Sequence, residues 1–172
     1  MRDRRADTMS TAPLPEALKL AEGSAFDIGA VMDVMEASFD PVFGEAWSAQ
    51  QCLGILDLPG VWLIIAWWDG APAGFALTRM ILDEAELLLI GVVPEHRRRG
   101  IAQSLLDATM ETARAKGVRH LHLEVRQGNC AIELYNRNGF HQVGRRRDYY
   151  RGGDGSLFDA LSLTKPLLRD FK

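Results

Sequence analysis

Apolar side chains recur at helical spacing in two stretches of the N-terminal third of the chain. The first covers residues 28–39 and the second residues 48–56, with hydrophobic positions three and four residues apart. Asp27 and Ser48 stand at the start of these stretches as candidate N-caps, and Pro41 follows the first. The pattern predicts one helix over 28–39 and a shorter one over 48–56.

The pattern changes to that of strands after residue 60. Residues 61–68 (VWLIIAWW) are rich in β-branched and aromatic side chains, and the turn-forming pair Asp69-Gly70 separates them from a similar run over 73–80. This arrangement is typical of a β-hairpin. A third apolar run over 85–93 ends at a proline. We therefore expect three consecutive strands.

The remainder of the chain alternates between helix and strand. Residues 101–116 place apolar side chains on one helical face and are followed by Gly117, a typical residue for the end of a helix. Further patterns predict a strand over 120–125, a helix over 131–138, and strands over 142–147 and 158–164. The strand–helix–strand unit within 85–125 should be a right-handed crossover, so its strands are expected to be parallel neighbours. The fold class is α/β, or α+β in layers.

Length and composition indicate one globular domain. The 172 residues are 47% hydrophobic and 25% charged, enough for a core of its own. Residues 1–15 are polar and contain two prolines, so we expect a disordered extension before a single domain over 16–172. No apolar run reaches the ~18–20 residues of a membrane span and no secretory signal is visible, which predicts a cytoplasmic protein without membrane contact. Cys52 and Cys130 are expected to be reduced and mostly buried.

Charge is divided unevenly along the chain. Residues 16–94 contain twelve acidic and two basic side chains, whereas residues 95–151 contain twelve basic and six acidic ones. The division suggests two electrostatic faces, one suited to an anionic ligand and the other to a cationic one. A solvated surface without such a role is the alternative.

The segment Pro94–Ala102 (PEHRRRGIA) joins the third strand to the long helix. A basic loop with Gly100 at the helix entrance leaves backbone N–H groups pointing where the helix dipole favours an anion. The loop lacks the Lys-Ser/Thr end of a P-loop and the three glycines of a dinucleotide-binding motif. A pyrophosphate that undergoes no reaction at phosphorus fits better than nucleotide hydrolysis or hydride transfer.

The string VVPEHRRRGIAQSLL resembles the acyl-CoA-binding motif of the GCN5-related N-acetyltransferase (GNAT) superfamily, and LHLEVRQGNCAIELYNRNGF resembles its second motif with the Leu-Tyr-x-x-x-Gly-Phe signature. Segments such as DEAEL, LEVR and RDYY are most similar to the RimI-type ribosomal-protein-alanine N-acetyltransferases. The resemblance implies a mixed, mostly antiparallel sheet that splays at a parallel strand pair, with helices on both faces.

The resemblance also implies an acetyl-CoA site in two parts. Backbone groups of one strand would pair with the pantetheine arm, and N–H groups from Arg98 to Gln103 would hold the pyrophosphate. Asn129 would contact CoA, although it stands six positions before Tyr135 where the family usually has seven. The implied cofactor-binding residues are Ile90, Gly91, Val92, Arg97, Arg98, Arg99, Gly100, Ile101, Ala102, Gln103 and Asn129.

Two residues match the catalytic positions of the family. Glu124 would be the general base that takes the ammonium proton, and Tyr135 the general acid that protonates the departing thiolate. A surface acid and an aromatic core residue are the respective structural alternatives. His120 and His122 form a His-x-His pair, but no cysteine or carboxylate is placed to complete a metal shell, so no metal is expected.

The acceptor is expected to be a protein N-terminal α-amine, because its reference pKa of ~7.7–8.0 lies far below that of lysine, and the resemblance implies that it belongs to a ribosomal protein. A basic acceptor would be attracted by the acidic half, for which the candidates are Glu36, Asp40, Glu45, Glu84 and Glu86. Tyr149 and Tyr150 resemble residues beside the acceptor cleft. Transfer to a lysine or a small amine, a non-catalytic acyl-CoA sensor, and RNA binding through the arginine clusters are the alternatives, of which RNA binding is disfavoured by the low isoelectric point.

Overall fold

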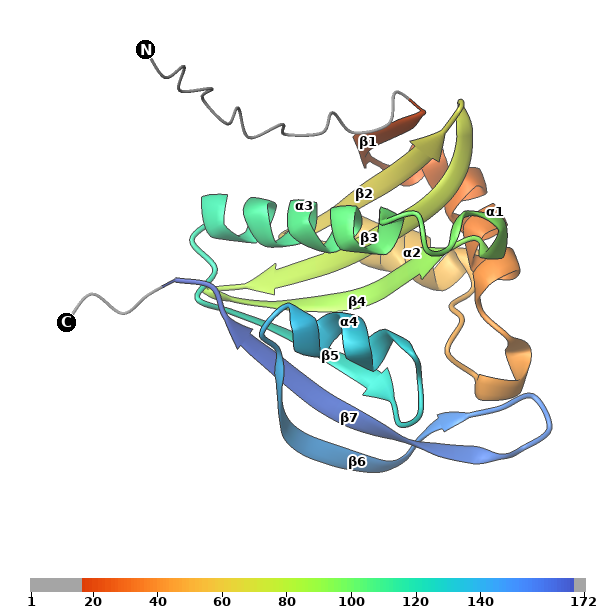
Figure 1. The fold of residues 1–172 in the computed structure, drawn as a ribbon, viewed down its shortest axis with the longest axis vertical. Helices are drawn as coiled ribbons and strands as arrows, with labels where there is room; N and C mark the ends of the chain where they lie inside the picture. The colour runs from red at the N-terminus through yellow and green to blue at the C-terminus, as the bar shows by residue number, and fades with distance from the viewer. Residues whose placement is uncertain (1–16, 169–172) are drawn as a thin grey trace, which may run out of the picture.

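A single twisted sheet organises the computed structural model, which describes residues 17–168 (Figure 1). The strands lie side by side in the order β1-β2-β3-β4-β5-β7-β6. Their bounds are β1 (Leu18–Gly23), β2 (Val61–Trp68), β3 (Ala71–Ile81), β4 (Glu84–Val92), β5 (His120–Arg126), β6 (His141–Arg151) and β7 (Leu157–Pro166). The helices are α1 (Ile28–Ser38), α2 (Ala49–Leu56), α3 (Ile101–Ala115) and α4 (Ala131–Arg137), with 3-10 turns η1 (Ala25–Asp27), η2 (Pro41–Phe43) and η3 (Pro94–His96).

Helices α1 and α3 cover opposite faces of the sheet. A Cβ atom added to Gly74 of β3 would meet Leu105 and Ile101 of α3, whereas one added to Gly91, opposite the next residue of β3, would meet Ser38 of α1. Successive strand residues point to opposite faces, so the two helices enclose the sheet between them. The largest fully buried side chains belong to these layers: Phe75, Met35, Leu63, Ile65, Leu77, Ile101, Leu105, Leu106 and Leu121.

Strands β4 and β5 are parallel neighbours, which confirms the predicted crossover. They pair only at their first residues, where Glu84 to Glu86 face His120 to His122. Beyond this point β4 stays paired with β3 as far as Val92, and β5 stays paired with β7 as far as Arg126. The two strands therefore diverge, and within residues 17–168 no strand fills the gap between their facing edges.

The helix caps follow the prediction at one site and depart from it at another. Ser48 caps α2 in a reciprocal capping box with Gln51, as expected. Asp27 is the N-cap residue of α1, as expected, but its side chain makes no capping hydrogen bond to this helix. Asp27 instead accepts from the backbone N–H of Ser24, whose own hydroxyl caps the preceding η1 turn. The chain enters α1 through this extra turn.

Strand β1 was not predicted. Of its residues only Leu18 is buried, because it is a short edge strand paired with β2 alone, so its hydrophobic pattern is weak. Strand β6 extends past the predicted end at residue 147, through a bulge at which Asp148 has φ +51°. Cys52 is buried but Cys130 is exposed, so the expectation of buried thiols holds only for the first; both are free. The predicted extension 1–15 lies outside the described residues.

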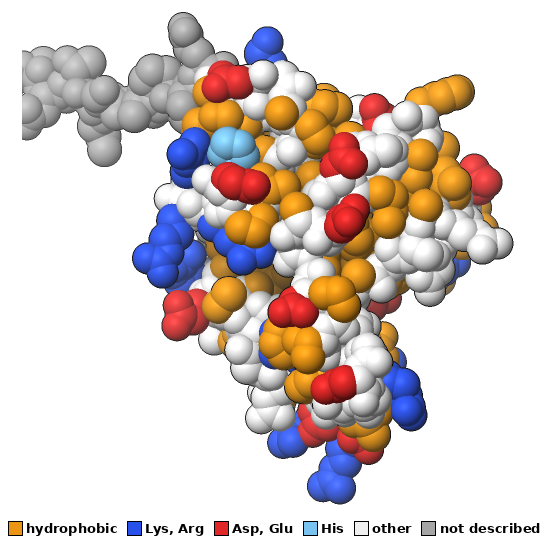
Figure 2. All heavy atoms as spheres, turned by 90° about the vertical axis from the view of Figure 1, so that its right-hand side faces the viewer, with side chains coloured by type: hydrophobic (Ala, Val, Ile, Leu, Met, Phe, Trp, Pro, Cys, Tyr) orange, Lys and Arg blue, Asp and Glu red, His pale blue; other side chains and the backbone are white. Residues whose placement is uncertain are grey.

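Within residues 17–168 no helix is long and apolar enough to cross a membrane. Figure 2 shows the face that lies on the right in Figure 1; hydrophobic side chains cover its middle, with acidic side chains among them. Lysine and arginine side chains gather along one edge and at the lower tip of this view. Acidic and basic groups are thus unevenly distributed on this face.

The connection between α1 and α2 packs closely against the β6–β7 hairpin at Gly44, where a larger side chain should destabilise the fold. Gly44 has φ +66°, and a Cβ atom there would lie 1.8 Å from the backbone oxygen of Arg151. The variant Gly44→Ala should lose about 1–3 kcal/mol of unfolding free energy in chemical denaturation, through strain and displaced backbone. In the control Gly54→Ala, a helical site with nothing within 4 Å, we expect no loss or a gain of up to about 1 kcal/mol. Equal stabilities of the two variants would contradict the contact.

Candidate active site

The loop between β4 and α3 presents backbone donors at the mouth of the gap. Gly100 is the N-cap of α3 in the left-handed region, with φ +78°, and Arg98 also has a positive φ of +62°. No side chain caps this helix. The first-turn N–H groups of a helix have no partner within the helix, so those of residues 101–103 are available to a ligand. An anion fits this position because the dipole and the free donors act together.

Two of the three arginines of the loop, Arg97 and Arg99, contact different parts of the protein. The exposed side chain of Arg97 donates from Nε to the oxygen of Val92 at 3.3 Å and from Nη2 to the oxygen of Ser38 at 3.1 Å. It thereby ties the end of β4 to the end of α1. The guanidinium of Arg99 lies 4.9 Å from the ring centroid of Trp68 and contacts His96, whose ring stacks on the same tryptophan. The side chain of Arg97 thus holds backbone, and the Arg99 side chain packs on an aromatic surface.

Gln103 connects the first turn of α3 to the end of α4. Its side-chain amide exchanges two hydrogen bonds with the amide of Asn138, at 2.8 and 2.9 Å. Asn138 is the C-cap of α4 and also donates to the oxygen of Leu134. With the side chain of Gln103 engaged, its backbone N–H is the group left for a ligand.

Asn129 lies in the turn between β5 and α4, and its side chain is also occupied. It accepts from the N–H of Ala131 at 2.9 Å and donates to Glu45 at 3.4 Å. Glu45 forms an ion pair of 3.2 Å with Arg126, and both side chains are only 12% exposed. The guanidinium of Arg126 also lies 3.7 Å from the ring centroid of Phe43. The contacts fasten the α1–α2 connection to the end of β5.

Tyr135 is buried in α4, with 4% of its surface exposed and its ring edge-on to Phe140. Its hydroxyl makes no hydrogen bond to any residue within 17–168. Burial raises the pKa of this phenol far above its usual value of 10, and the negative charge of Glu45 raises it further. The phenol therefore remains protonated under ordinary conditions, as a proton donor must.

Glu124 lies on β5 just beyond its last pairing with β4, on the face opposite Leu123 and Val125. Its side chain is 13% exposed. Oε2 accepts from the hydroxyl of Ser162 at 2.7 Å, and Oε1 forms an ion pair with Nε of Arg146 at 3.2 Å. The hydroxyl of Tyr150 donates to the backbone oxygen of Glu124 at 3.3 Å. Both the strand and the carboxylate are therefore fixed in place.

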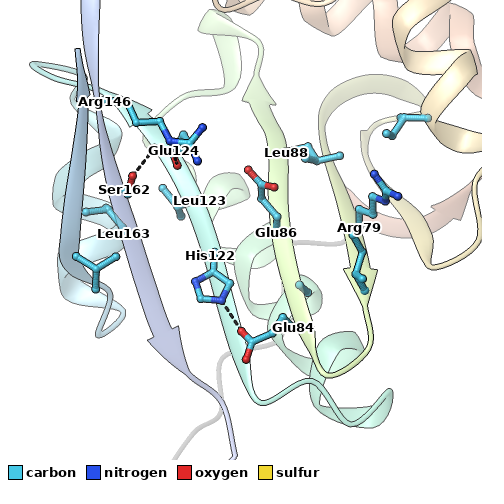
Figure 3. Close-up of a pocket in the computed structure, with 14 residues that line it drawn as sticks. Arg79, Glu84, Glu86, Leu88, His122, Leu123, Glu124, Arg146, Ser162 and Leu163 are labelled. Atoms are coloured by element: carbon cyan, nitrogen blue, oxygen red, sulfur yellow. Dashed lines mark hydrogen bonds and ion pairs between the residues drawn. The ribbon is translucent and has the colours of Figure 1, made fainter. Parts of the chain in front are cut away.

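Glu124 lines a cleft of about 410 Å³ between the sheet and its flanking elements (Figure 3). Charged and polar side chains enter it from five neighbouring strands, β3 to β7. The apolar part comes from α2 and several strands. The polar members are Arg79, Glu84, Glu86, His122, Arg146 and Ser162, and the apolar ones include Ile55, Ile81, Leu88 and Val143.

The His-x-His pair has a carboxylate partner in Glu84, which hydrogen-bonds to both imidazoles. Glu84 contacts Nδ1 of His120 at 3.0 Å and Nε2 of His122 with its other oxygen. The register explains this: Glu84 opposes His120 directly across the parallel pair, which the sequence alone does not reveal. Hydrogen bonds from the two imidazoles lower the pKa of Glu84, outweighing the desolvation that would raise it. No group suited to holding a metal ion was found among the residues of the described domain.

Some of the residues predicted to attract the acceptor lie in the cleft and others lie outside it. Glu84 and Glu86 line the cleft, whereas Glu45 is paired beneath the α1–α2 connection. The rings of Tyr149 and Tyr150 pack edge to face, with centroids 4.9 Å apart. Burial, followed by the charge of Glu45, raises the pKa of Tyr150 far above its usual value.

Comparison with known proteins agrees with this architecture. Residues 28–140 match the acetyltransferase (GNAT) family. A ribosomal protein bS18-alanine N-acetyltransferase of Escherichia coli (strain K12) is 40% identical over 100 residues, covering 58% of this chain and 67% of that protein. The enzyme of the same name from Haemophilus ducreyi is 41% identical over 91 residues, covering 52% and 63%.

Solved structures give the same result. The crystal structure of the ribosomal-protein-S18-alanine N-acetyltransferase from Escherichia coli superposes with a TM-score of 0.80 at 28% identity, covering 90% of this chain and 97% of that one. Ard1 from Thermoplasma volcanium superposes with a TM-score of 0.76 at 26% identity, covering 89% and 99%. The likeness extends over almost the whole described domain.

The chain belongs to the GNAT family of acetyltransferases. It is an acetyl-CoA-dependent N-acetyltransferase, and its nearest similarities among the proteins compared above are to enzymes of the RimI type. The family and fold implied by the sequence resemblance are thereby confirmed.

The environment of Tyr135 leads to a prediction for its titration. Because burial disfavours the phenolate, Tyr135 should stay protonated while an ordinary tyrosine ionises near pH 10. In an absorbance titration, Tyr135→Phe should leave the phenolate signal that develops up to about pH 10.5 unchanged and remove signal only at higher pH, where unfolding also begins. A loss of absorbance in the step near pH 10 would contradict the burial of this hydroxyl.

Proposed function

We propose that this enzyme transfers the acetyl group of acetyl-CoA to the α-amine of a protein N-terminus, with ribosomal protein bS18 as the acceptor suggested by its relatives. The observation that carries the proposal is the position of Glu124, a carboxylate held by Arg146 and Ser162 at the point where β4 and β5 part. Its cleft lies on the face opposite α3, so an amine and a cofactor could approach from two sides of the sheet.

Residues at the gap fit the two ends of acetyl-CoA. The unpaired edge of β4 offers the backbone of Ile90, Gly91 and Val92 to the amides of the pantetheine arm, as an added strand would use it. The free N–H groups of residues 98–103 suit the pyrophosphate. Bound acetyl-CoA would supply the thioester carbonyl that the amine attacks.

The proton transfers are assigned to two side chains. Each oxygen of Glu124 has one protein partner, and a carboxylate oxygen has two lone-pair sites, so the remaining sites can accept a proton from the α-ammonium. The protonated phenol of Tyr135 donates to the thiolate as the carbon–sulfur bond breaks. The neutral amine forms the new bond to the thioester carbon directly as the carbon–sulfur bond breaks, without a covalent acyl-enzyme.

An α-amine suits this arrangement better than a lysine. With a reference pKa of ~7.7–8.0 an α-ammonium loses its proton to a single carboxylate far more readily than a lysine at ~10.4. The cleft acids favour a basic N-terminal segment, because opposite charges steer the encounter.

The roles of Glu124 and Tyr135 are tested by Glu124→Gln and Tyr135→Phe. With a peptide that has an N-terminal alanine and an internal lysine, both variants should lower kcat about 10²-fold while binding acetyl-CoA normally. The Glu124→Gln deficit should be largest below neutral pH and shrink above pH 8, where the amine is already neutral.

The exposed Glu111 of α3 provides a matched control, and Glu111→Gln should behave as the wild type. Mass spectrometry of the products locates the acetyl group. Modification of the internal lysine alone would refute the α-amine assignment, and unaltered pH profiles would remove Glu124 from the mechanism.

The pyrophosphate assignment is tested at Gly100. The variant Gly100→Asp places an anion at the start of α3 and should weaken acetyl-CoA binding at least about 100-fold in calorimetry, because it competes for the same donors. Gly100→Asn carries the same left-handed backbone strain without the charge, so it should lose much less. Similar affinities for the two variants would show that charge at this position is irrelevant.

A further inference from the structure

Three carboxylates line the cleft, and only one of them is free. Glu84 uses both oxygens for the two imidazoles, and Glu124 uses both for Ser162 and Arg146. Glu86 makes no hydrogen bond or ion pair with any residue that the structure describes, although its side chain enters the same cleft. Glu86 therefore has all of its acceptor sites open to a ligand, in addition to the lone-pair sites that Glu124 keeps for the reacting amine.

Glu86 stands beside the proposed base. It directly opposes His122 on β5 and Arg79 on β3, on the face that carries Glu124 (Figure 3). In Figure 3 its carboxylate points toward the side of the cleft on which Glu124 lies. Partial desolvation raises the pKa of Glu86, and the negative charge of Glu124 raises it further. The positive charges of Arg146, His122 and Arg79 act in the opposite direction. A cation bound directly at Glu86 would further stabilise its ionised form.

The walls of the cleft fit one kind of cation. Ile55, Ile81, Leu88 and Val143 line it with apolar surface, next to the single unpaired carboxylate. Lysine and arginine side chains have long aliphatic stems that pack on apolar surface while the charged head stays in a polar environment. An acceptor whose α-amine is at Glu124 would extend its neighbouring side chains along this surface.

We propose that Glu86 is a specificity residue that binds a lysine or arginine side chain within the first three residues of the acceptor protein. This inference rests on the proposed function, since it takes Glu124 as the site of the amine. The acceptor class is thus a protein N-terminus with a cationic residue directly behind the reacting amine.

The arginines near Glu86 provide a second, opposite effect on the binding of a cationic acceptor. Arg146 is already paired with Glu124, whereas Arg79 has a buried Nε without a hydrogen-bond partner among the described residues and lies beyond ion-pair distance of Glu86. Its positive charge opposes a cationic acceptor. Removing Glu86 and removing Arg79 should therefore change the preference for cationic acceptors in opposite directions.

The experiment uses peptides that begin with alanine and differ only in carrying arginine or glutamine at position 2 or 3. Their affinities for the CoA-bound full-length protein are measured by calorimetry, and their kcat and KM by CoA release. For the wild type, arginine at one of the two positions should lower Kd and KM about tenfold relative to the matching glutamine peptide, with kcat nearly the same. Glu86→Gln should abolish the preference, Arg79→Gln should increase it, and added salt should weaken it.

Glu22→Gln, at an exposed strand position on β1 outside the cleft, is the matched control and should retain the preference. An equal loss for arginine and glutamine peptides in Glu86→Gln would overturn the specificity role, as would a wild type without preference. Thermal unfolding of each variant separates these results from misfolding.

Binding and turnover also separate the two proposals. Arginine-selective binding that depends on Glu86, without acetylation of any peptide α-amine, would support this cleft and refute the α-amine reaction. Acetylation of both peptides with no effect of Glu86→Gln on selectivity would support the reaction and refute the role of Glu86.

Discussion

The brevity of the β4–β5 pairing is the constraint on which the site depends. Three residues of each strand face one another, after which each strand follows its outer partner, β3 or β7. The gap leaves backbone N–H and C=O groups without a strand, and such groups are costly to bury without a partner. A cofactor rich in amides can meet that requirement where a side chain cannot. The same divergence places Glu124 beside the gap, so the cleft and the unpaired edge of β4 lie next to each other.

The ion pairs in and around the cleft stabilise different parts of the structure. Arg146 and Ser162 hold the carboxylate of Glu124, whereas Arg126 and Glu45 join the α1–α2 connection to β5. Because Arg126 and Glu45 are largely buried, losing one partner would leave a costly uncompensated charge. In contrast, the α3 entrance relies on backbone donors, so an anion there does not require the Arg97 side chain, which is engaged with Val92 and Ser38.

The sequence predicted those elements whose pattern reflects burial on a known face. Helix α3 was predicted to within one residue at its end, since it packs one apolar stripe on the sheet. Strand β1 was not predicted, because a short edge strand buries few side chains and so has a weak hydrophobic pattern. For the site, the family resemblance implied Glu124, Tyr135 and the loop, whereas the partnership of Glu84 with His120 depends on interstrand register. The engaged side chains of Arg97, Gln103 and Asn129 were likewise invisible, because their partners are distant in sequence.

The paired amides of Gln103 and Asn138 have a mechanical consequence. They join the first turn of α3 to the last turn of α4, the helix that carries Tyr135. The two hydrogen bonds therefore couple the first turn of α3 to the C-terminal end of α4, so that each helix end restrains the position of the other. If the start of α3 and Tyr135 act as proposed, this amide pair sets the distance between them before a substrate binds, and its loss would change that distance without altering either site directly.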